Sequence, residues 1–131
     1  MASIVALATG GCGGPMRADE LKRGIDSIAS TASDGKLLAQ DVSRNRTRST
    51  FVRVHARDLA DDADHEAEKL ADAQARGAVA RIKAQAVMLA QQVSSALGDL
   101  QVMPGDEATG AQVARRLRAY AAKAGDLSAA L

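Results

Sequence analysis

The sequence predicts an all-α protein folded as an up-down-up-down four-helix bundle. Apolar residues recur at alternating spacings of three and four through most of the chain, which is the period of one face of an α-helix. Polar segments, glycine and proline interrupt this period at three places, and they divide the chain into four stretches of similar length. Alanine fills 29 of the 131 positions, whereas the chain has one Phe, one Tyr and no Trp. This composition favours closely packed helices over a sheet.

The first helix is expected from about Ala18 to Arg44. Its apolar stripe consists of Leu21, Ile25, Ile28, Ala32, Gly35, Ala39 and Val42. The stripe keeps its register through Asp34-Gly35, which predicts one continuous helix. Because Asp-Gly is also a turn signal, the alternative is a short helix that ends at Ser33 and a second one that begins at Lys36.

A polar segment, residues 43–50, interrupts the apolar period after the first helix. It contains no apolar side chain, and its Asn, Ser and Thr residues compete for backbone hydrogen bonds, which favours a turn. Ser49 or Thr50 is a good N-cap for the helix that follows. The alternative is one long helix from Lys36 to Ala75. We prefer the break because it leaves four helices of similar length.

The second helix is expected from Phe51 to Ala75, with Gly77 available for the left-handed position that often ends a helix. Its stripe consists of Val52, Ala56, Leu59, Ala63, Glu66 and Leu70. Glu66 is the one charged member, and our interpretation is that the stripe turns towards solvent at this point. The alternative is a buried Glu66 paired with an arginine of another helix, since an unpaired buried carboxylate is costly.

The third and fourth helices are expected on either side of Pro104-Gly105. The third runs from Ala78 to Val102, and Asp106, with Thr109 as a second candidate, caps the fourth. Their stripes consist of Val79, Ile82, Ala86, Leu89, Val93, Ala96 and Leu100, and of Val113, Leu117, Tyr120, Ala124, Leu127 and Leu131. Each helix has about 25 residues and is therefore about 38 Å long. Four equal amphipathic helices with short connections predict the bundle.

The first sixteen residues carry no charged side chain and contain the only cysteine, Cys12. A short apolar run leads into Leu7, Ala8, Thr9, Gly10, Gly11 and Cys12, and Gly13-Gly14 follows. This pattern resembles the signal-peptide end of a bacterial lipoprotein, with Thr9 where that family prefers leucine. The resemblance implies that residues 1–16 are a signal-peptide remnant and flexible tether, that residues 17–131 are the bundle, and that Cys12 carries a lipid. The alternative is an N-terminal segment with an incidental cysteine.

No catalytic constellation, cofactor site or enzyme-type metal site is predicted. Asp62 and His65 have a spacing that resembles half of a ferritin-like di-iron site, but that family needs carboxylates from all four helices and a second histidine. Both histidines, His55 and His65, fall on the second helix. A surface site for a divalent ion at Asp61, Asp62 and His65 is the alternative to a solvated acidic face. We expect His55 to be hydrogen bonded to Asp58 or to backbone.

Arg44, Arg46, Arg48, Arg53 and Arg57 form the one concentrated basic region and are the candidate anion-binding residues. The formal net charge of the chain is +1, no aromatic residues alternate with these arginines, and no helix-turn-helix pattern is present. Nucleic acid is therefore not the expected partner. The basic region can also neutralise the acidic residues of its own helix or of a second copy.

Two hypotheses about function follow from these observations. The leading hypothesis is a small helical bundle of the bacterial cell envelope, extracytoplasmic and anchored to the membrane by a lipid on Cys12, with a structural or interaction role. The alternative is a soluble cytosolic helical binding module whose arginine cluster meets an anionic partner. A protein partner or a homo-oligomer fits either hypothesis, because heptads this regular also join two chains.

Overall fold

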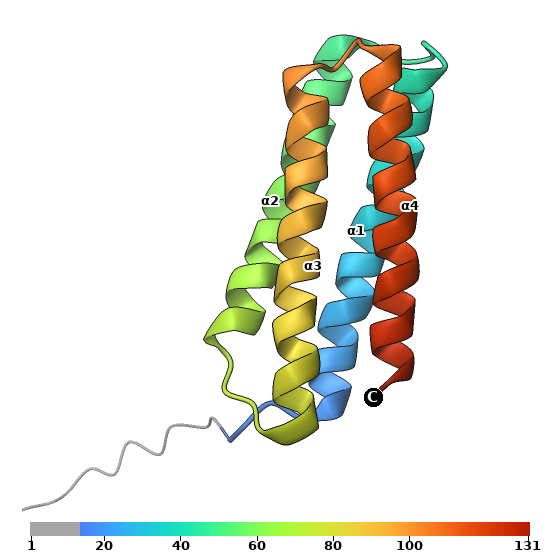
Figure 1. Cartoon of the computed structure of the whole chain (residues 1–131). Helices are drawn as coiled ribbons and strands as arrows, with labels where there is room; N and C mark the ends of the chain where they lie inside the picture. Colours follow the sequence, from blue (N-terminus) through green and yellow to red (C-terminus); the bar gives the residue numbers. More distant parts are fainter. Residues whose placement is uncertain (1–13) are drawn as a thin grey trace, which may run out of the picture.

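Four antiparallel helices make up the bundle in the computed structural model, which describes residues 14–131 (Figure 1). The helices are α1 (Ala18–Ser43), α2 (Ser49–Asp72), α3 (Gly77–Val102) and α4 (Glu107–Ala129). The described part of the chain contains no strand. The predicted all-α, up-down-up-down architecture is confirmed, and α1 is continuous through Asp34-Gly35.

The helices associate as two extensively packed pairs, α1 with α4 and α2 with α3. Helix α1 also contacts α2 and α3, and α3 contacts α4, whereas the backbones of α2 and α4 do not approach each other. Near the C-terminus, the Lys22 ammonium donates a hydrogen bond of 2.8 Å to the Ser128 hydroxyl, which donates one of 3.2 Å to Asp26. These bonds link the first turns of α1 to the last turn of α4.

None of the four helices combines the length and the apolar character needed to cross a membrane.

The predicted stripes form the core. Every stripe residue of α1 and α2 is buried, as are the five stripe residues of α3 from Ala86 to Leu100. Val79 and Ile82 in the first turns of α3, Tyr120 in α4, and Leu131 just after the end of α4 are half-buried. The buried face is wider than each stripe and also takes in Leu38, Ala60, Ala67, Ala90, Leu97 and Ala114. These extra positions arise because each helix meets more than one neighbour.

The interpretation that the stripe of α2 turns to solvent at Glu66 is wrong. Glu66 is buried, with 9% of its surface exposed. The glycine at position 24 of α1 leaves room for it, since a β-carbon there would lie 2.8 Å from Oε1 of Glu66. The nearest cation is not an arginine from another helix but Lys69, one turn further along α2, with its Nζ atom 4.0 Å from Oε1.

Helix α1 ends in a hydrogen-bonding pattern that was not predicted from the sequence. Asn45 has a left-handed backbone, its N–H donates to the carbonyl of Val42, and the N–H of Arg46 donates to the carbonyl of Asp41. This is a Schellman motif in which asparagine takes the usual place of glycine. Helix α2 then begins at Ser49, with Arg48 at the N-cap position and no side-chain cap. The expected capping role of Ser49 or Thr50 is therefore wrong.

Helix α2 ends three residues earlier than expected, at Asp72. Its last carbonyls are bound from outside the helix, because the Lys83 ammonium donates to the carbonyls of Leu70 and Ala71 at 3.0 and 3.5 Å. Gly77 does have a left-handed backbone, but it begins α3 instead of ending α2. A cation at the C-terminus of a helix stabilises the exposed carbonyls and the helix dipole, so no glycine is needed there.

The expected cap of α4 is confirmed. Asp106 accepts hydrogen bonds from the backbone N–H of Thr109 at 2.9 Å and from the Thr109 hydroxyl at 2.6 Å. The hydroxyl bond and then the N–H bond lower the pKa of Asp106 below its ordinary value, because both stabilise the ionised carboxylate.

Candidate interaction site

The structure places three of the candidate arginines at one end of the bundle. Arg44, Arg46 and Arg48 all belong to the connection between α1 and α2, and all three are exposed. We refer to these three residues as the arginine end. The connection between α3 and α4 lies beside it, since a β-carbon on Gly105 would be 2.9 Å from the Ser49 hydroxyl.

The other two candidate arginines lie on the flank of α2. Arg53 and Arg57 are one turn apart and exposed. A step of two residues turns about 200° around an α-helix, so this pair faces away from Phe51 and His55. Because Phe51 and His55 border α1, Arg53 and Arg57 lie on the side of α2 remote from α1. The structure therefore divides the predicted cluster into an end group and a flank group.

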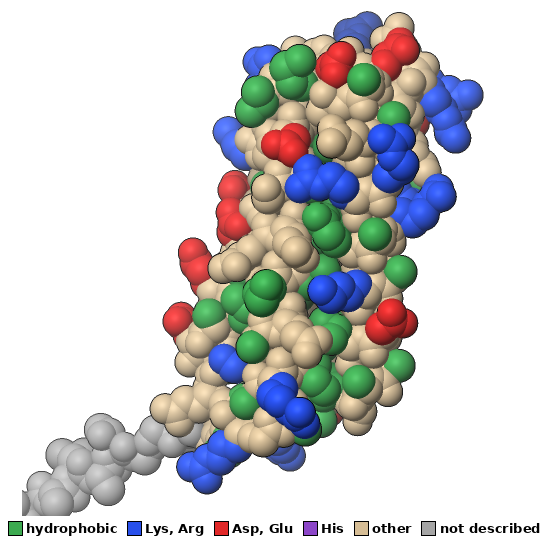
Figure 2. All heavy atoms as spheres, viewed as in Figure 1, with side chains coloured by type: hydrophobic (Ala, Val, Ile, Leu, Met, Phe, Trp, Pro, Cys, Tyr) green, Lys and Arg blue, Asp and Glu red, His purple; other side chains and the backbone are tan. Residues whose placement is uncertain are grey.

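Few of these arginines are paired with carboxylates. Arg57 lies 3.8 Å from Asp58, and both side chains are more than half exposed, so the pair contributes little stability. The other four arginines have no carboxylate within 4.0 Å among residues 14–131. Acidic side chains instead follow the outer face of α2, which forms the left edge of the molecule in Figure 2. The exposed carboxylates there are Asp58, Asp61, Asp62, Asp64, Glu68 and Asp72.

The aromatic residue of α2 faces a shallow hollow next to α1. Phe51 stacks on His55 with ring centroids 5.4 Å apart and an interplanar angle of 18°. The expected hydrogen bond of His55 to Asp58 or to backbone is not formed in the described chain, and the imidazole packs on the Phe51 ring instead. The two rings line a hollow of about 240 Å³ together with Asp34, Leu37, Leu38 and Asp41. Phe51 and Leu37 are more than half exposed. Sequence reasoning missed this surface because Leu37 comes from a different helix.

The described chain does not bring the candidate metal ligands together. Asp61, Asp62 and His65 are all exposed, and residues 14–131 contain no group of three or more His, Cys, Asp or Glu side chains placed to hold an ion. The spacing of Asp62 and His65 on one helix therefore does not extend to a ligand set.

One short ion pair between helices was not anticipated from the sequence. The Arg116 guanidinium of α4 donates a hydrogen bond of 2.7 Å to the Asp99 carboxylate of α3. Tyr120, one turn along α4, and Asp99 together raise the pKa of Arg116, since both favour the charged guanidinium. The pair joins the two helices on their outer surface.

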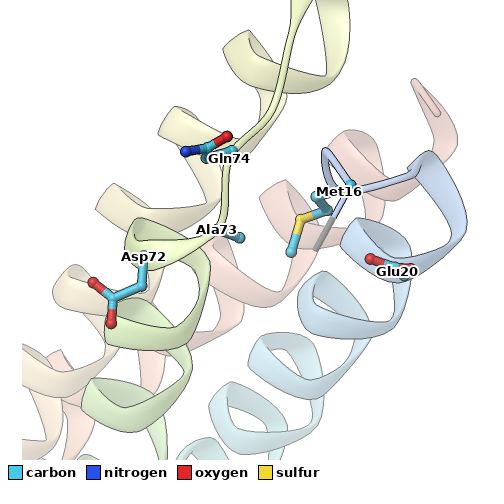
Figure 3. Close-up of a pocket in the computed structure, with 6 residues that line it drawn as sticks. Met16, Glu20, Asp72, Ala73 and Gln74 are labelled. Carbon is cyan, nitrogen blue, oxygen red and sulfur yellow. The ribbon is translucent and has the colours of Figure 1, made fainter. Parts of the chain in front are cut away.

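The opposite end of the bundle, which we call the tether end, receives the start of the described chain. The N–H of Met16 donates a hydrogen bond of 2.7 Å to the carbonyl of Gln74, in the connection between α2 and α3. A hollow of about 330 Å³ surrounds this contact and is shown in Figure 3, where Met16 lies between Glu20 of α1 and the end of α2. Cys12, the predicted lipidation residue, lies outside the described residues.

Comparison of the chain with protein-family models, with curated proteins and with solved structures gives no match.

Proposed function

We propose that this protein is a lipid-anchored helical bundle of the bacterial cell envelope, with the lipid on Cys12 and an interaction role. The observation that carries the proposal is the position of Cys12, the only thiol in the chain, after a short apolar run and small residues and before Gly13-Gly14. A diacyl or triacyl anchor at this position would hold the protein to a membrane in an effectively permanent way.

The arrangement of the bundle is consistent with this proposal. The described chain starts at the tether end, against Gln74, only a few residues after Cys12. The arginine end lies at the other end of helices of about 26 residues, which corresponds to about 39 Å. An anchored bundle would therefore present Arg44, Arg46 and Arg48 away from the bilayer, where a partner can reach them.

The test is expression of the gene with its own upstream region in a bacterial host, followed by membrane fractionation and intact mass spectrometry. We expect a membrane-bound protein that begins at Cys12 and carries the mass of acyl chains. Cys12→Ser should remove that mass while the circular dichroism spectrum stays helical. A soluble, unmodified chain that still contains residues 1–11 would contradict the proposal.

A second candidate function is binding of an anionic partner at the arginine end. The observation that favours it is the exposure of Arg44, Arg46 and Arg48 without a carboxylate within 4.0 Å in the described chain. Such cations attract phosphate or carboxylate groups in a manner that salt weakens. Sedimentation with phosphatidylglycerol vesicles and titration with polyphosphate measure this binding. Replacing the three arginines by serine should weaken binding at least tenfold. Arg118 is an exposed arginine in the middle of α4, so Arg118→Ser should change binding little, and equal effects would argue against this candidate.

A further inference from the structure

An apolar surface lies across α1 and α2, next to the arginine end. Leu37 of α1 and Phe51 and Val54 of α2 are 58%, 57% and 49% exposed, and they are three of the six large apolar side chains that are this exposed in the described chain. Leu37 and Phe51 line the hollow of about 240 Å³, and Val54 follows Phe51 by one turn. We call these three residues and the hollow the Phe51 face. Exposed apolar groups gathered in this way mark interaction surfaces.

Cations border the Phe51 face on one side. Arg44 directly follows α1 and Arg48 directly precedes α2, so the arginine end lies beyond Leu37 and Phe51 along both helices. Asp41, which also lines the hollow, is the carboxylate that opposes this charge. One carboxylate against three exposed arginines leaves this side net positive.

Carboxylates border the Phe51 face on the other side. Asp58 and Asp62 follow His55 by three and seven residues, so they continue the same face of α2 towards the tether end. Asp34, the first residue of α1 that lines the hollow, lies on this side as well. All three carboxylates are exposed. Arg57, at 3.8 Å from Asp58, offsets one of the three charges, so this side is net negative.

The order of cations, apolar residues and carboxylates makes this surface complementary to itself. A two-fold axis through the hollow turns a second copy end for end, so that the arginine end of each copy meets the carboxylates of the other. The spacing along α2 agrees with this arrangement. Arg48 lies five residues before the midpoint of Phe51 and His55, and Asp58 lies five residues after it. Both are therefore about 7.5 Å from an axis at that level, and each Arg48 is level with Asp58 of the second copy.

We propose that the Phe51 face is the interface of an antiparallel two-fold homodimer, with Leu37 and Phe51 at its centre and Arg48–Asp58 pairs on either side of the axis. The second copy covers the apolar side chains and supplies carboxylates to the arginines. This inference goes beyond the proposed function and stands whether or not Cys12 carries a lipid. Because the tether ends of the two copies point in opposite directions, two anchored copies would stand on facing membrane surfaces.

Sedimentation of the unmodified full-length chain tests the dimer directly, in a reducing agent so that Cys12 does not link copies covalently. We expect a monomer–dimer equilibrium between about 10 µM and 1 mM, as suits a small interface. Raising the salt concentration from about 50 mM to 500 mM should weaken the dimer at least threefold, because the ion pairs are exposed and screened. A chain that stays monomeric at 1 mM, or one that forms species larger than a dimer, would overturn the proposal, since a two-fold interface closes at two copies.

Phe51→Ser tests the centre of the interface. Phe51 is exposed, so its replacement spares the core, and we expect the dissociation constant to rise at least tenfold. Met88→Ser is the matched control, because Met88 is 61% exposed on α3, which contributes no residue to the Phe51 face. It should leave the dissociation constant within about twofold of the wild-type value. Equal effects of the two substitutions would place the contact elsewhere and contradict the proposal.

An exchange of charges tests the end-for-end register. Arg48→Asp and Asp58→Arg should each weaken the dimer at least fivefold, since each places like charges level with one another across the axis. The double variant restores opposite charges and should return the dissociation constant to within about twofold of the wild-type value. Both positions are exposed, and circular dichroism verifies that the variants keep their helices. Single variants without effect, or a double variant that fails to recover, would contradict the pairing of Arg48 with Asp58.

Discussion

The Oε1 atom of Glu66 lies 2.8 Å from the place that a β-carbon on Gly24 would occupy. A glycine inside a helix costs about 1 kcal/mol relative to alanine. Helix propensity disfavours a glycine at this position of α1. The glycine is needed because the carboxylate of Glu66, from α2, is buried against it. The two residues are 42 positions apart, so only the packing of α1 against α2 relates them.

Gly24→Ala should therefore stabilise the protein less than alanine does at an open helical glycine. Gly98 in α3 is the matched control, since nothing lies within 4 Å of its β-carbon position, and Gly98→Ala should gain roughly 0.5–1 kcal/mol. At Gly24 the same gain is offset by displacement of Glu66 and Leu70. Denaturant unfolding of the two variants measures the difference. Equal gains would show that the Glu66 carboxylate is not held against α1.

Gly110 should not tolerate alanine. A β-carbon there would lie 2.7 Å from the backbone nitrogen of Ser43 and 2.9 Å from the carbonyl oxygen of Ala39, and backbone atoms of a packed helix cannot easily move aside. We expect Gly110→Ala to lower the free energy of unfolding by about 1–3 kcal/mol. Gly125→Ala in the same helix meets nothing within 4 Å and should raise it by roughly 0.5–1 kcal/mol. Changes of the same sign in the two variants would contradict the close approach of α4 to α1.

Leu89→Asp should be severely destabilising. Leu89 is fully buried in α3, so the substitution places an unpaired charge in the core and removes apolar contacts, at a cost of several kcal/mol. Gln91→Asp changes an exposed position two residues away and should cost no more than about 0.5 kcal/mol, despite the neighbouring Asp64 and Glu68 carboxylates. Thermal unfolding followed by circular dichroism compares them, and similar melting temperatures would show that the register of α3 is wrong.

The stabilising effect of the Asp106 charge should disappear in acid. Its pKa in the folded protein is lowered from the ordinary value of 3.8, so the contribution is fully present above about pH 4 and is lost as pH falls through the folded pKa. Asp106→Asn keeps a side-chain acceptor at the N-cap but removes the charge. The wild-type protein should melt at the higher temperature near pH 6, and the two melting temperatures should converge below pH 3.8. A constant difference down to pH 2.5 would contradict a lowered pKa for Asp106.

Only part of the candidate sites could be predicted from the sequence. The polar composition of residues 43–50 correctly predicts a connection that exposes Arg44, Arg46 and Arg48. The separation of Arg53 and Arg57 from these three follows from helix geometry once α2 is known to begin at Ser49. The Phe51–His55 surface and the burial of Glu66 could not be predicted, because each depends on residues of α1 that lie far away in the sequence.

The sequence by itself determined the four helices, the continuity of α1, the Asp106 cap and the residues that form the centre of the core. Apolar periodicity and helix-breaking residues are local properties, and they report which face of a helix avoids water without reference to its neighbours. Only the tertiary structure decided that α1 pairs with α4 and α2 with α3, that Lys83 binds the end of α2, and that Glu66 is buried opposite Gly24. These features depend on which residues face each other across two helices, and the period of a single helix carries no information about its partner.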